Sequence, residues 1–214
     1  MNNRNEKTLG LVQVALFTAI IFVLAMVPGL GYIPLGIIRA TTIHIPVIIG
    51  SVVLGAKKGA VLGGMFGLTS LINNTINPTV TSFVFSPILA MEMGGIKGAI
   101  MSFIICFVPR ILIGIVPYYV YGGIRKLMGK GKASKVVALG AAGVAGSMTN
   151  TLLVMNLIYV LFGEQYATAK EMPYEALYGS ILGIIGMNGV PEAIVAAVLV
   201  VAIGRVFLKS RMMK

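Results

Sequence analysis

The stretch IMSFIICFVPRILIGIVPYYVY, residues 100–121, decides the fold class of this chain. It is an apolar run of the ~20 residues that a helix needs to cross a membrane, yet it contains an arginine, Arg110. A second run, ILGIIGMNGVPEAIVAAVLVVAIG at 181–204, contains a glutamate, Glu192. A charge in hydrocarbon costs at least about 2.5–3.5 kcal/mol, so it persists only when it is paired, solvated or part of a functional site. The two charges therefore suggest a polar site inside a membrane bundle.

The composition supports an all-α integral membrane protein. Of the 214 residues, 57% are hydrophobic and only 11% are charged, and the mean hydropathy is +0.97. Soluble domains carry about 25% charged residues. The lone cysteine, Cys106, excludes an intramolecular disulfide and a cysteine-based metal site.

Apolar runs bounded by proline, glycine, asparagine and charge predict six transmembrane helices within a single transmembrane domain, residues 1–214. The expected helices cover residues 9–27, 42–54, 59–72, 97–121, 136–162 and 178–208. The first is interpreted as a retained helix, because its apolar run is too long for a secretory signal and no small-x-small cleavage site follows. The stretch around 81–91 is expected to be a loop with a short helix.

The basic residues give the orientation. Most of the 17 lysines and arginines fall in four segments, at 4–7, 57–58, 125–135 and 205–214. If the N-terminus is cytoplasmic, all four segments are cytoplasmic, which is a strong positive-inside pattern. Both termini are therefore expected in the cytoplasm. The same pattern accounts for the net charge of +11 without a nucleic-acid partner.

Arg110 and Glu192 are expected at similar depth. Counted from the outer ends of their helices, they lie roughly 20 Å and roughly 22 Å into the membrane at 1.5 Å per residue. Opposite charges at equal depth can form a purely structural ion pair, which would offset much of the cost of burial. Alternatively, one or both line a ligand cavity. The residues alone leave both interpretations open.

Two asparagines lie near the same depth. Asn188 is four residues before Glu192 and shares its helix face, and Asn150 lies near mid-membrane on the helix over 136–162. A single amide in lipid can simply hold helices together by hydrogen bonding. Four polar groups from three helices at one depth favour a cavity. Proline precedes each charge, at Pro109 and Pro191, and each proline frees a backbone carbonyl that needs a partner.

The expected external loops are rich in hydrogen-bonding groups with few charges. This suits an ordered lid over a polar solute that is neutral or singly charged, although ordinary turn chemistry accounts equally well for each residue alone. The candidate loop residues are Asn73, Asn74, Asn77 and Thr81, with Arg39 and His44 as groups that could meet an anion. His44 is the only histidine and has no second ligand at metal spacing, so no metal site is expected.

Small residues recur at four-residue spacing. Ala15 and Ala19 form such a pair on the first helix, and Gly59, Gly63 and Gly67 repeat the spacing on the third. These patterns allow close helix approach within the chain or, more specifically, docking to another membrane protein. The chain contains no GxxxxGK[ST], HExxH or GxSxG pattern and no paired carboxylates. We therefore expect no enzyme activity and no cofactor, and a binding subunit rather than a complete pump.

Four stretches resemble the S components of energy-coupling-factor (ECF) vitamin transporters. They are RATTIHIPVIIGSVVLGAKKGAVLGGMFGLTSLI (39–72), CFVPRILIG (106–114), AGSMTNTLLVM (145–155) and NGVPEAIVAA (188–197). The resemblance covers residues 9–205, and Ala15 with Ala19 matches the AxxxA pattern of the family's first helix. Within the family, the stretches at 44–55 and 66–87 are most similar to pantothenate-specific members.

The resemblance implies a multi-pass substrate-binding subunit of the cell membrane that captures a vitamin, here pantothenate, from outside. It also implies a partner complex of one membrane T subunit, on which the Ala15/Ala19 face would dock, and two cytoplasmic ATPases. The subunit would release its vitamin inside by toppling against the T subunit. Other vitamins (folate, riboflavin, hydroxymethylpyrimidine) remain alternatives, as does a stand-alone proton-coupled transporter using Arg110 and Glu192 as a relay.

Overall fold

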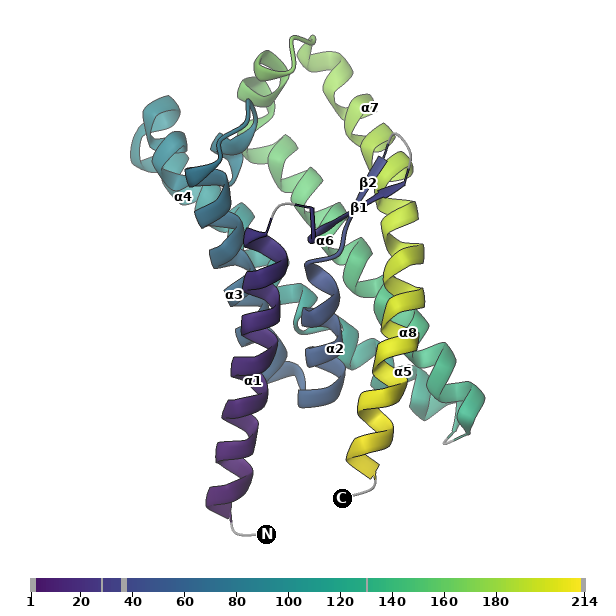
Figure 1. Cartoon of the computed structure of the whole chain (residues 1–214). Helices are drawn as coiled ribbons and strands as arrows, with labels where there is room; N and C mark the ends of the chain where they lie inside the picture. Colours follow the sequence, from purple (N-terminus) through teal and green to yellow (C-terminus); the bar gives the residue numbers. More distant parts are fainter. Residues whose placement is uncertain (1–2, 28, 36–37, 130, 213–214) are drawn as a thin grey trace.

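A computed structural model describes residues 3–27, 29–35, 38–129 and 131–212, with the side chains of 3–6, 32–40 and 209–212 outside the description. The chain forms a helical bundle with one short β-hairpin at one end (Figure 1). In chain order, the elements are α1 (Asn3–Met26), β1 (Tyr32–Leu35), β2 (Ile38–Thr41), α2 (His44–Leu54), α3 (Ala56–Ile76), η1 (Ser82–Val84), α4 (Pro87–Ile113), α5 (Val116–Met128), α6 (Lys132–Ala169), α7 (Tyr174–Ile184), η2 (Ile185–Gly189) and α8 (Val190–Met212).

The expected all-α architecture is confirmed apart from the hairpin. Strands β1 and β2 pair antiparallel, with Tyr32 opposite Thr41 and Leu35 opposite Ile38. Among the residues that the structure describes, four helical segments are long and apolar enough to cross a membrane: Lys7–Met26, Pro87–Met128, Lys132–Ala169 and Tyr174–Leu208. The start of α1 and the end of α8 lie at the same end of the bundle, away from the hairpin (Figure 1).

The helix expected over 97–121 differs most from the structure. Helix α4 already begins at Pro87, in the stretch expected to be a loop with a short helix, and it ends at Ile113, where a turn leads into α5. Inside α4, Gly94 and Gly95 leave the helical conformation, and Gly95 has φ 58°, which glycine adopts without a steric penalty. The arm at 87–93 therefore folds back on the longer arm.

Helix α2 forms the centre of the bundle. It is only 11 residues long, but all of its residues from His44 to Val53 are buried. Helices α1, α3, α5, α6 and α8 pack around it, so its backbone and side chains meet protein rather than lipid. A short, uniformly apolar helix is stable in this position because its neighbours supply the packing.

Glycines bring α3 and α4 together. A Cβ added at Gly59 or Gly63 would collide with the backbone of α4, and one at Gly67 would press on the carbonyl oxygen of Cys106. The expected close approach is therefore confirmed as packing within the chain. This contact seats α4 directly against α3, so side chains from both helices reach the same space.

A polar layer separates two apolar clusters along three helices. On α4, Arg110 lies between Ile105 of one cluster and Ile113 of the other. The same order holds on α6, where Asn150 and Thr151 come between Leu139 and Val154. It holds again along α7–α8, where Asn188 and Glu192 come between residues 181 and 196. These polar side chains therefore lie at one level of the bundle.

Candidate functional site

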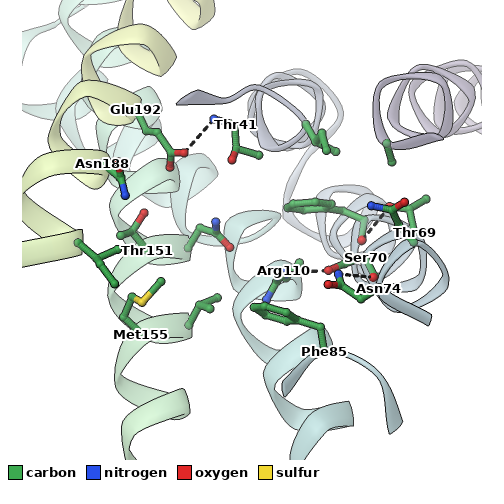
Figure 2. Close-up of a pocket in the computed structure, with 17 residues that line it drawn as sticks. Thr41, Thr69, Ser70, Asn74, Phe85, Arg110, Thr151, Met155, Asn188 and Glu192 are labelled. Carbon is green, nitrogen blue, oxygen red and sulfur yellow. Dashed lines mark hydrogen bonds between the residues drawn. The ribbon is translucent and has the colours of Figure 1, made fainter. Parts of the chain in front are cut away.

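A pocket of about 360 Å³ occupies this polar layer (Figure 2). Its lining comes from α1, the end of the hairpin, α3, α4, α6 and the α7–α8 segment. The lining residues are Ala25, Thr41, Ile43, Phe66, Thr69, Ser70, Asn73, Asn74, Phe85, Arg110, Asn150, Thr151, Val154, Met155, Ile184, Asn188 and Glu192. Six of the candidate residues from the sequence lie here together: Arg110, Asn150, Asn188, Glu192, Asn73 and Asn74.

Arg110 forms one wall of the pocket. Its side chain is 6% exposed, and its guanidinium lies 5.5 Å from the centre of the Phe66 ring and 5.1 Å from that of Phe85. Nη2 donates to the Ser70 hydroxyl at 3.4 Å. The faces of aromatic rings attract a cation. The arginine charge is therefore stabilised by residues of α3 and of the segment before α4. The glycine contacts described above hold α3 against α4.

Pro109 explains a further contact of Arg110. In a regular helix the Ile105 carbonyl would accept a hydrogen bond from the N–H of residue 109, which proline lacks. Arg110 Nη1 donates to this carbonyl oxygen at 2.8 Å instead. The sequence predicts that Pro109 leaves a carbonyl free for a new partner, and that partner is the side chain of the next residue, Arg110. This bond also fixes the direction of the guanidinium.

Glu192 and Asn188 form the facing wall. The segment Ile185–Gly189 is a π-helical turn, followed by Pro191 in α8. Proline cannot donate to the preceding turn, and a π-turn is a common way to absorb that loss, often at functional sites. Both side chains line the pocket from this irregular segment. Glu192 is 9% exposed, and its Oε1 accepts the backbone N–H of Thr41 at 2.8 Å, which ties β2 to α8.

Arg110 and Glu192 lie apart, and not in the ion pair that was one of the two interpretations of the sequence. Figure 2 shows the two side chains on opposite sides of the pocket. The described contacts of Arg110 run to α3 and α4, whereas Glu192 bonds to Thr41. Equal depth brought the two charges into one layer, but α4 and α8 face each other across the cavity. Of the two interpretations from the sequence, the structural pair is wrong for the described residues.

The segment after α3 is anchored by a hydrogen-bond network. Asn74 Nδ2 donates to the Ser70 carbonyl at 2.8 Å, and its Oδ1 accepts the Ser82 hydroxyl at 2.9 Å. Asn77 is exposed, lies outside the pocket lining and donates to Asn73 Oδ1 at 3.0 Å. Thr81 also lies outside the lining, just before η1. Asn73 and Asn74, expected in a loop, belong instead to the last turns of α3, and of the four candidates Asn73, Asn74, Asn77 and Thr81 only these two line the pocket.

The remaining candidates lie elsewhere. The side chain of Arg39 is outside the described residues, although its backbone pairs with Pro34 in the hairpin. His44 is fully buried on α2 and does not line the pocket. Ala15 and Ala19 are exposed on the outer face of α1. Within the described ranges no group of three His, Cys, Asp or Glu side chains is placed to hold a metal ion.

Sequence reasoning missed several lining residues. Thr69, Ser70 and Thr151 were overlooked because a hydroxyl in an apolar helix often bonds its own backbone, as Thr69 does with the Phe66 carbonyl at 2.9 Å. Phe66 and Phe85 were overlooked because aromatic residues are ordinary in a membrane helix. The spacing of Phe66 and Ser70, one turn apart and next to the glycine repeat, was the signal that could have found them.

The sequence matches the family described as "ECF transporter, substrate-specific component" over residues 10–204. The chain belongs to this family. The S component described here is 38% identical to the pantothenic acid transporter PanT of Lactococcus lactis subsp. cremoris over 174 residues, which cover 81% of this chain and 80% of that protein. It is 31% identical to the pantothenate transporter PanT of Leuconostoc mesenteroides subsp. mesenteroides over 210 residues, or 95% and 94% of the two chains. It is thus a multi-pass transporter protein of the cell membrane and not an enzyme.

Proposed function

We propose that this S component captures pantothenate in the pocket between Arg110 and Glu192. The observation that best supports this proposal is the pocket itself, which has a cation on one wall and a carboxylate acceptor on the other. Its volume of about 360 Å³ is at the lower end of the ~300–1,000 Å³ typical of small-molecule sites. Two relatives that cover most of the chain are named as pantothenate transporters, which supports the choice of vitamin.

The chemistry of pantothenate matches the polarity of the pocket. The molecule carries a carboxylate at one end, a central amide, and two hydroxyls at the other end. Arg110 would meet the carboxylate, since charge-assisted bonds to a buried guanidinium are the strongest that the pocket can offer. Glu192 and Asn188 would accept from the hydroxyls on the opposite wall. Asn74 and Asn150 would bond the groups between.

We further propose six membrane passes with both termini in the cytoplasm. Helix α3 has 21 residues, about 31 Å at 1.5 Å per residue, which matches a hydrocarbon core of about 30 Å. Helix α2 would be the second pass, its short length tolerated because it is enclosed by the other helices. The common position of the two chain ends (Figure 1) supports an even number of passes.

The same proposal assigns an ECF T subunit and two ATPase subunits as partners. The exposed Ala15 and Ala19 support a docking face on α1, because small residues let a partner helix approach closely. ATP hydrolysis on the partners would drive release of the vitamin inside. Uptake by this chain alone, driven by a pH gradient in liposomes without ATPases, would contradict this division of labour and favour a stand-alone transporter.

Calorimetric titration of the purified S component tests the choice of vitamin. We expect pantothenate to bind. We expect neither folate nor riboflavin to displace bound pantothenate. The Arg110→Ala protein should bind about 10- to 150-fold more weakly, the equivalent of a charged hydrogen bond. Arg125→Ala is the matched control, because Arg125 bonds the Gly131 carbonyl and does not line the pocket.

A ligand without the carboxylate isolates the role of Arg110. Pantothenol, in which an alcohol replaces that group, should bind the wild-type protein more weakly than pantothenate does. It should also lose much less affinity when Arg110 is replaced. Equal losses for both ligands in a folded Arg110→Ala protein would show that the arginine does not meet the carboxylate.

A further inference from the structure

His44 carries two buried polar atoms that the pocket does not use. The side chain is 0% exposed, and neither Nδ1 nor Nε2 has a hydrogen-bond partner among the described residues. Leaving a buried donor or acceptor unsatisfied costs about 1–3 kcal/mol. An imidazole with two unsatisfied nitrogens is therefore expected to reach a polar partner indirectly, through a bridging molecule.

Asn150 carries the complementary group. It lines the pocket from α6, and its Oδ1 is buried without a partner among the described residues. The hydroxyl oxygen of Ser147, three residues earlier on the same helix, is in the same condition. Residues three apart are neighbours on a helix surface. Helix α6 thus presents two unsatisfied oxygens close together.

The packing of α2 on α6 places these groups on the same side of one contact between the two helices. The first residues of the α2 segment reach the pocket through Ile43, and farther from it the Ile48 side chain packs on Gly146. Because α6 reaches the pocket at Asn150, the two helices run antiparallel. His44 lies one turn from Ile48 towards the pocket, and Asn150 lies one turn from Gly146 in the same direction. Residues four apart share a helix face, so His44 and Asn150 lie on the packed faces of α2 and α6, both on the pocket side of the contact between Ile48 and Gly146.

We propose that His44 is a positioning residue that holds the Asn150 amide through one buried water molecule beneath the pocket. Such a water needs two to four polar partners, and His44, Asn150 and Ser147 supply three. Holding the amide oxygen from below directs the amide NH2 into the pocket, where it donates to a carbonyl or carboxylate of the ligand. The role of Asn150 in ligand binding rests on the proposed function, whereas the water-mediated contact between His44 and Asn150 does not.

Nuclear magnetic resonance tests the contact without any ligand. Because the chain has one histidine, ¹⁵N-histidine labelling of a Strep-tagged protein gives a single imidazole. We expect Asn150→Leu to shift both ring nitrogens and change the tautomer ratio. The matched control is Asn156→Leu on the same helix, where the amide instead donates to the Leu152 carbonyl. An imidazole that responds to neither variant, or equally to both, overturns the proposal.

A double-mutant cycle in pantothenate affinity tests the positioning role. His44→Phe should weaken binding about five- to tenfold, the equivalent of one neutral hydrogen bond, and should have no further effect in the Asn150→Leu background. His44→Gln, which keeps a polar side chain, should restore part of the affinity and covers the case in which the Phe variant fails to fold. Additive losses from the two sites would overturn the role. Absence of pantothenate binding in the wild-type protein would refute the proposed function instead, and the imidazole signals would still decide the contact.

Discussion

Replacing Gly63 by alanine should separate the Arg110 wall from the rest of the pocket. A Cβ at this position would fall within 3.0 Å of the Arg110 carbonyl oxygen, closer than real Cβ contacts allow. That oxygen belongs to the backbone and cannot rotate away, so α4 must move outward by about 1 Å. Overpacking of this kind costs about 1–3 kcal/mol, a factor of about 5 to 150 in an equilibrium constant.

The displacement should appear in both stability and affinity. Moving α4 away from α3 stretches the bond between Arg110 and Ser70 and withdraws the guanidinium from Phe66. We expect a lower melting temperature in detergent and at least tenfold weaker ligand binding by calorimetry. Gly64→Ala is the matched control, because a Cβ there has open space within 4 Å. If both alanine variants behave like the wild type, backbone contact between α3 and α4 is not what positions Arg110.

Three further changes test the facing wall and the outer surface. Pro191→Ala restores a backbone donor, so the π-turn should relax to α-helix, with weaker ligand binding but equal or higher melting temperature; unchanged affinity would contradict a role for the turn. Glu192→Gln keeps an acceptor for the Thr41 N–H, whereas Glu192→Leu removes it, so hydrogen exchange at that amide should rise at least tenfold in the Leu variant alone. Ala15→Leu combined with Ala19→Leu should abolish uptake with the partner subunits while leaving vitamin binding intact, and normal uptake would exclude docking at this face.

Charge and helix spacing in the sequence led to residues that line the pocket. Arg110 and Glu192 were identifiable because a charge in an apolar run is costly, and Asn188 followed from its position one turn away. All three line the pocket. What spacing could not provide was the direction in which each helix faces. Lipid and protein core are equally apolar, so hydropathy does not reveal the inward face of a membrane helix.

Contacts between distant segments explain the other differences. The Arg110–Glu192 pair was inferred from depth alone, and depth says nothing about which side of a cavity a helix occupies. Pro191 and Gly95 permit a π-turn and a chain reversal, but the sequence does not show that either one forms. Phe85 could not be assigned to the site because it reaches Arg110 through the folded-back arm of α4.

The backbone contact between α3 and α4 also affects how binding free energy is divided. Immobilising a long side chain when a ligand binds usually costs about 0.5–1.5 kcal/mol. Arg110 is already held by the Ile105 carbonyl, Ser70 and two aromatic rings before any ligand arrives. The entropy lost on binding therefore falls mainly on the torsions of the ligand. Restricting the torsions of a flexible acidic ligand should therefore increase its affinity for this preorganised wall more than adding new contacts to the ligand does.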